Sequence, residues 1–310
     1  MSETVRRIGA LLRSLALLGV GNYGAMAVSL AINALLTRRL GVEAFGRLAL
    51  MLSVSQVASL LTANWTQSGI VRFGAQEFAS TGSIRETFWT RTWVVAPWTA
   101  LVVLVVLIAR DPLATYLTIP TWAVLLVLLH FLAAVLLTTV GAMFQARNEM
   151  SRYGAMLFLD KAVMAVFLLL MPQSWIGEPS RVVGLYALSS MGVAGWGVTV
   201  LGRRSFWPAV FDRVAYRRMT AFSLPLILSS WAGLFGTNWF DFVIIKWYRP
   251  VSDVGLYSLG TVLAGVVQQI TIVFSTWLLP QLSMMVAGGY TNRSASSSTV
   301  SSLTGFWRPQ

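Results

Sequence analysis

The sequence contains no cysteine, only one histidine and few charged residues. The lack of cysteine excludes disulfides and thiolate-bound zinc or iron–sulfur centres, and a single histidine excludes metal sites built from several histidines. Charged residues make up 11% of the 310-residue chain, against about 25% in soluble proteins, while hydrophobic residues make up 56%. With a mean hydropathy of +0.70, a water-soluble globular fold is excluded, and the sequence predicts an all-α integral membrane protein.

Long apolar segments, most of them uncharged, predict about eight transmembrane helices. A bilayer core about 30 Å thick requires roughly 20 apolar residues per helix, because unpaired peptide groups are too costly in hydrocarbon. The segments that meet this requirement are residues 14–37, 48–71, 92–109, 119–141, 153–171, 182–201, 219–245 and 254–279. The first is interpreted as a retained helix rather than a cleaved signal peptide, because its uncharged sequence continues to Leu36.

Basic residues are distributed unequally between the loops on the two sides of the membrane. With the N-terminus placed inside, 15 arginines fall on that side and 7 basic residues on the other, while Lys161 lies within a span. By the positive-inside rule this bias predicts a cytoplasmic N-terminus. It also explains most of the +12 net charge without a nucleic-acid partner.

The spans group into five expected regions. Residues 1–13 form a cytoplasmic N-terminus, 14–201 a six-helix lobe, 202–218 a cytoplasmic interfacial linker, and 219–279 the first two helices of an incomplete second lobe. The linker is expected to be a helix, because aromatic and aliphatic residues recur beside arginines between Phe206 and Val214. Residues 280–310 are rich in serine and are expected to be disordered. The chain is therefore interpreted as a fragment of a longer protein, with a complete eight-helix protein as the alternative.

An internal repeat supports the two lobes. Residues 40–50 (LGVEAFGRLAL) and 249–259 (RPVSDVGLYSL) align at a constant offset of 209. In both copies a short turn follows a membrane helix, and Gly46 or Gly255 lies near the start of the next one. Because the preceding spans are six apart, they point the same way, which predicts parallel lobes related by an axis along the membrane normal.

Several segments resemble the polysaccharide biosynthesis flippases. These are residues 35–46 (LLTRRLGVEAFG), 69–73 (GIVRF), 224–226 (LPL), 255–258 (GLYS) and 280–283 (PQLS). The resemblance extends over about residues 5–285. It is to the Wzx-type O-antigen and capsule flippases of the multidrug/oligosaccharidyl-lipid/polysaccharide exporter superfamily. These motifs are degenerate and do not indicate a particular glycan.

The resemblance implies two six-helix lobes around a central cavity and movement of undecaprenyl-diphosphate-linked oligosaccharide across the bacterial cytoplasmic membrane by alternating access. The implied partners are the lipid-linked oligosaccharide, membrane lipids, and a glycan polymerase with its export machinery. No cofactor and no metal are expected. The chain lacks the last four or more helices of that pattern.

Asp160 and Lys161 are the main candidates for transport chemistry. Each costs roughly 2.5–3.5 kcal/mol at mid-bilayer on insertion scales, so both are expected to face a cavity or a partner. Adjacent helical positions do not face each other, so each residue is expected to find its partner on another helix. Lys161 would attract the substrate diphosphate. Asp160 would adjust the charge of Lys161 or carry a coupling proton. The alternative is a structural ion pair.

Four further residues are candidates for the substrate or ion path. His130, within a span, can relay protons or serve as a neutral packing residue. Arg72 corresponds to the arginine of the family's Gly-x-x-x-Phe neighbourhood and can contact phosphate or act only as a topogenic charge. Asp241 and Lys246 can form an outer gate or a structural pair with each other.

Other functions have weaker support. No glycine-rich Walker motif is found, and the loops are too short for an ATPase domain. A membrane glycosyltransferase or polymerase would need clustered acidic residues, whereas the 11 acidic residues are scattered. An ion-coupled multidrug exporter of the same superfamily and a non-functional fragment remain as alternatives.

Overall fold

A computed structural model describes residues 3–235 and 238–287, and within them every regular element is helical. Six helices are long and apolar enough to cross a membrane, namely Ala16–Thr62, Arg85–Ile108, Ala123–Ala146, Met150–Leu170, Pro179–Leu201 and Arg213–Tyr248. The all-α membrane fold is therefore confirmed. The eighth expected span, residues 254–279, lies in a further long helix whose side chains are described only in part.

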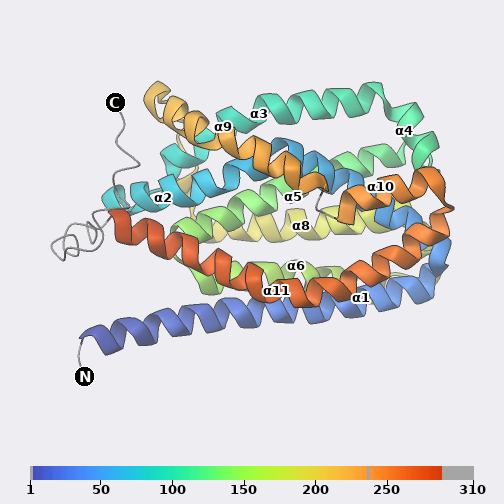
Figure 1. The fold of residues 1–310 in the computed structure, drawn as a ribbon, viewed down its shortest axis with the longest axis horizontal. Coiled ribbons are helices and arrows are strands. Elements are labelled where there is room, and N and C mark those ends of the chain that lie inside the picture. The colour runs from blue at the N-terminus through green and yellow to red at the C-terminus, as the bar shows by residue number, and fades with distance from the viewer. Residues whose placement is uncertain (1–2, 236–237, 288–310) are drawn as a thin grey trace.

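The first helix, α1 (Glu3–Thr62), consists of two arms. They meet at Gly41, whose φ of 75° and ψ of 169° favour glycine over residues with a side chain. Figure 1 shows the first arm running the length of the bundle and the second returning beside it. Residues 16–62 number 47, which is about 70 Å of helix or roughly twice the bilayer core. The first two expected spans are therefore the two arms of α1.

The second expected span is interrupted rather than continuous. Its helix ends at Thr62, and a single turn, η1 (Asn64–Thr66), separates it from α2 (Gln67–Thr81). Such a break within membrane depth is tolerated only where protein groups satisfy the freed backbone atoms. Here Arg91 donates to the oxygen of Ala63 at 3.4 Å and to the Thr66 hydroxyl at 3.0 Å.

The middle of the chain forms the rest of the first bundle. Its helices are α3 (Arg85–Ile108), α4 (Arg110–Leu117), α5 (Ala123–Ala146), α6 (Met150–Leu170), α7 (Gln173–Ile176) and α8 (Pro179–Leu201). Helix α5 lies among its neighbours, and its Phe131 and Phe144 are among the largest fully buried side chains. It begins at Ala123 rather than at the expected residue 119, because the chain turns after Pro120.

The linker between the two expected lobes is not the helix that the sequence predicts. A short turn, η2 (Arg203–Ser205), is followed by residues 206–212 without helix, and α9 (Arg213–Phe235) begins afterwards. The aromatic residues instead pack on α3. The rings of Phe206 and Phe88 lie 4.9 Å apart, and the Trp89 indole donates to the Phe206 oxygen at 2.7 Å. These contacts hold the linker against α3.

The last part of the chain comprises α10 (Asn238–Tyr248) and α11 (Val251–Ala287). Helix α11 continues beyond Pro280, so the expected tail begins later than the composition indicates. Residues 288–310 lie outside the described part of the chain. In Figure 1, α11 runs along the bundle beside the first arm of α1.

The two copies of the internal repeat contact each other reciprocally. The second arm of α1 resumes at Val42 after Gly41, and α11 begins at Val251, the equivalent position at offset 209. A Cβ added to Gly46 would collide with the backbone oxygen of Val251, and one added to Gly255 would collide with that of Val42. Contacts exchanged in this way are the mark of a local two-fold axis.

Candidate functional site

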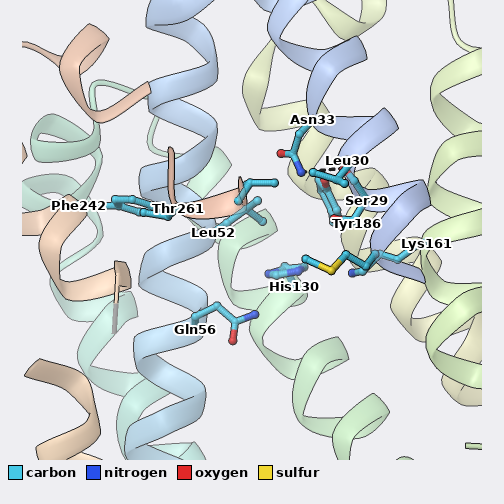
Figure 2. A pocket seen from close by; sticks show the side chains of 12 residues that line it. Ser29, Leu30, Asn33, Leu52, Gln56, His130, Lys161, Tyr186, Phe242 and Thr261 are labelled. Carbon is cyan, nitrogen blue, oxygen red and sulfur yellow. Dashed lines mark hydrogen bonds between the residues drawn. The ribbon is translucent and has the colours of Figure 1, made fainter. Parts of the chain in front are cut away.

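A cavity lies among helices from both parts of the chain. It measures about 440 Å³ and is lined by Met26, Ser29, Leu30, Asn33, Leu52, Gln56, His130, Lys161, Tyr186, Phe242, Thr261 and Val262. Figure 2 shows Asn33, Gln56, His130 and Lys161 around one space. Helices α1, α5, α6 and α8 form most of its wall, and α10 and α11 close it. Polar cavities at the interface of transporter repeats are typical of substrate sites.

Some lining residues of the cavity come from positions that the offset of 209 relates. Two pairs of its lining positions are separated by the repeat offset of 209, namely Asn33 with Phe242 and Leu52 with Thr261. A smaller space of about 70 Å³ adjoins it and shares these four residues. The equivalent positions therefore converge on the same cavity, as they would around a shared axis.

Lys161 and Asp160 pair with each other. The ammonium of Lys161 lies 2.8 Å from Asp160 Oδ2, so the expectation of separate partners on other helices is wrong for Lys161. The long lysine stem curls back to its neighbour, which the geometry of the helix backbone alone does not reveal. Asp160 additionally accepts a 2.8 Å hydrogen bond from Ser190 on α8. The Lys161 side chain is 34% exposed and that of Asp160 only 7%, so the cation faces the cavity while the carboxylate is held behind it.

His130 lines the same cavity in a fixed position. Its Nδ1 shares a 2.7 Å hydrogen bond with the hydroxyl of Ser55 on α1. Its ring also lies edge-on to Tyr186, with centroids 6.1 Å apart, and it is buried. The ring centre of Tyr186 in turn lies 5.9 Å from the Lys161 ammonium. The structure therefore brings His130, Asp160 and Lys161 into one neighbourhood.

Arg72, Asp241 and Lys246 do not line the cavity. The exposed guanidinium of Arg72 lies 4.7 Å from the ring centre of Phe222, in a contact between α2 and α9. Asp241 accepts a 2.7 Å hydrogen bond from the Tyr257 hydroxyl instead of pairing with Lys246. The expected pair is wrong, because Tyr257 on α11 lies within reach of the carboxylate.

Two amide side chains in the cavity wall were not singled out from the sequence. Asn33 and Gln56 lie on the two arms of α1, and the Asn33 amide donates to the oxygen of Ser29 at 2.8 Å. An amide within an otherwise apolar span is the signal that would have identified both. In the described residues, no group of three or more acidic or histidine side chains is arranged to hold a metal.

Arg91 is a buried cation that the charge count treats as an ordinary loop residue. It is only 4% exposed. Its guanidinium donates to Thr66, to the oxygen of Ala63 and to Thr139 of α5. Three segments of the first bundle are thus joined by one side chain. No sequence signal distinguishes it from neighbouring topogenic arginines, because its burial depends on the break at η1.

Comparison with known proteins identifies the family. No curated protein and no solved structure matches the chain. The sequence model of a family described as polysaccharide biosynthesis protein matches residues 11–286, nearly the whole described chain. The resemblance drawn from the short motifs is thereby confirmed. The chain is a multi-pass membrane protein that belongs to the polysaccharide biosynthesis protein family.

Proposed function

We propose that this protein moves a lipid-linked oligosaccharide across the bacterial cytoplasmic membrane by alternating access. Family membership supports a role in polysaccharide biosynthesis. The observation that carries the proposal is the cavity of about 440 Å³, in which Lys161 is the one cation among the lining residues that the structure describes. An undecaprenyl-diphosphate-linked glycan, in which a polar glycan and a diphosphate are joined to a lipid, needs a polar site of this kind to cross hydrocarbon.

Lys161 is suited to attract a diphosphate. Asp160 Oδ2 lies 2.8 Å from its ammonium and offsets part of the cost of placing a charge at this depth. Asp160 is also held by Ser190, so the carboxylate remains in place when the ammonium moves. A diphosphate in the cavity can therefore compete for the flexible lysine while Asp160 stays behind it. His130 occupies the same wall, where its hydrogen bond to Ser55 holds the ring in place.

Alternating access is supported by the arrangement of the repeat. The cavity lies between positions that recur at offset 209, and the repeats touch through Gly46 and Gly255 beyond it. Rocking of one repeat against the other about such a contact opens a central site to each side in turn. The cytoplasmic leaflet is the proposed starting side.

Lys161→Ala tests the proposal. The purified chain in lipid nanodiscs should bind undecaprenyl diphosphate, and the variant should bind it at least tenfold more weakly, about 1.4 kcal/mol. Lys161→Arg should retain most of the affinity because it keeps the charge. Movement of a fluorescent lipid-linked oligosaccharide across proteoliposomes should fall in parallel.

Lys246→Ala is the matched control, since Lys246 is the only other lysine of the chain and does not line the cavity. The affinity of this variant for undecaprenyl diphosphate should remain within about twofold of that of the wild type. An equal loss of affinity for undecaprenyl diphosphate in both alanine variants, or no loss in either, would contradict a specific role for Lys161. A wild-type chain that binds undecaprenyl diphosphate without moving the oligosaccharide would contradict transport by this chain.

A further inference from the structure

A second cavity lies near the break between α1 and α2. It measures about 220 Å³ and is lined by Asn64, Gln67, Ser68, Val71, Gln145, Ser275 and Thr276. Six of these seven side chains are amides or hydroxyls, and none is charged. A concentration of uncharged hydrogen-bonding groups is unusual in a chain of this hydropathy, because such groups are costly in hydrocarbon unless they have partners.

The local fold directs these groups into one space. Positions 64, 67, 68 and 71 follow the spacing that places residues on one helical face. The η1 turn begins this face, and α2 continues it. Gln145, near the end of α5, is only 5% exposed. Ser275 and Thr276 approach from α11, which packs against α2.

The second cavity belongs to the same interface as the central one. Gln67 and Thr276 are separated by 209 positions, as are Leu52 and Thr261 in the central cavity. Helix α11 runs past both, from Thr261 to Ser275. These fourteen residues span about 21 Å at 1.5 Å per residue. The two cavities therefore lie at different depths along one interface between the repeats.

We propose that this second cavity is a subsite for an uncharged sugar of the transported lipid. This inference rests on the proposed function and deepens it. Sugar hydroxyls both donate and accept hydrogen bonds, and amide and hydroxyl side chains offer the same two capacities. Among the described lining residues there is no cation for a phosphate, and Val71 alone would face an aliphatic chain. A volume of about 220 Å³ accommodates a sugar ring but is smaller than pockets for drug-sized ligands, roughly 300–1,000 Å³.

Recognition by hydrogen bonds makes a clear prediction for the sugar. A site built to bond hydroxyls discriminates strongly against a ligand that lacks them, because its polar groups are then left unpaired. The full chain in nanodiscs should therefore bind undecaprenyl diphosphate more tightly when it carries a neutral oligosaccharide of N-acetylglucosamine, glucose or galactose that is long enough to reach from the central cavity to the second one. The preference should be at least tenfold for one of the three.

Gln67→Leu tests the subsite, because it removes the amide at similar volume. In this variant we expect the preference for the sugar-bearing lipid over undecaprenyl diphosphate to fall about tenfold. The affinity for undecaprenyl diphosphate itself should be unchanged. Gln76→Leu is the matched control on the same helix outside the cavity and should keep the full preference. Thermal unfolding in detergent verifies that both variants are folded, and Ser275→Ala serves as a second subsite variant if Gln67→Leu is not.

The outcomes separate the two proposals. Equal affinity for all four lipids, or a full preference retained in Gln67→Leu, overturns the sugar subsite and leaves the proposed function standing. A wild-type chain that binds none of the lipids contradicts the proposed function and the subsite with it. A preference lost equally in Gln76→Leu also overturns the subsite.

Discussion

At the scale of single residues, burial separates charges that look alike in the sequence. Arg91 and Arg72 both lie near the ends of expected spans, yet one is enclosed by three polar partners and the other is exposed beside an aromatic ring. Asp160 and Lys161 were recognisable as functional candidates, because charges within a span are costly. Their pairing with each other depends on side-chain conformation, which residue spacing does not specify.

Arg91→Lys should destabilise the protein although the charge is conserved. An ammonium cannot span the acceptors of Ala63, Thr66 and Thr139 that the guanidinium reaches together. Hydrogen bonds to charged groups contribute about 1.5–3 kcal/mol each, so we expect a loss of about 2–4 kcal/mol. Unfolding in a graded detergent titration measures it. Arg85→Lys on the same helix is the control and should change stability by less than about 0.5 kcal/mol; similar losses in both would contradict the bracing role.

At the scale of helices, glycine positions decide how closely the repeats approach. Gly41 permits the reversal of α1 because of its positive φ. Gly46 and Gly255 permit contact between backbones, which small residues favour in membranes. The short repeat in the sequence located these glycines correctly. Only the tertiary structure shows that these two glycines lie at the same contact and not against different neighbours.

Gly255→Ala should weaken the contact between α11 and α1. The added methyl group would collide with the backbone oxygen of Val42, which cannot move aside as a side chain can. Overpacking of this kind costs typically about 1–3 kcal/mol. Gly260→Ala on the same helix has no atom within 4 Å of the added Cβ. It should be neutral or stabilising by up to about 1 kcal/mol. Thermal unfolding compares the two, and equal melting temperatures would argue against the close contact.

At the scale of the whole molecule, the two ends of the bundle are expected to face opposite sides of the membrane. In Figure 1 the N-terminus and the junction of α2 and α3 lie at one end, and α4 lies at the other. The arginine bias predicts that the N-terminal end is cytoplasmic. Eight of the fifteen arginines assigned to the N-terminal side precede the linker, and one of these eight, Arg91, does not contribute as a loop charge because it is buried.

Single-cysteine labelling tests this orientation directly, since the natural chain has no cysteine. A membrane-impermeant maleimide should label Thr115→Cys of α4 in intact bacterial cells. It should label Ser80→Cys of α2 only after the cells are opened. Both side chains are exposed in the structure, and the unaltered chain provides the unlabelled control. The reverse pattern would place the N-terminus outside and contradict the proposed orientation.

The sequence by itself determined the membrane class, most helix positions, the family and two of the cavity residues, His130 and Lys161. These follow from hydropathy, charge and short motifs, which are local properties of the chain. Only the tertiary structure decided that Asn33 and Gln56 share their cavity, that Arg91 is buried and that residues 206–212 are not helical. It also brought Gln67 beside Thr276. Such relations depend on side chains far apart in the sequence, whose meeting is set by how the helices pack.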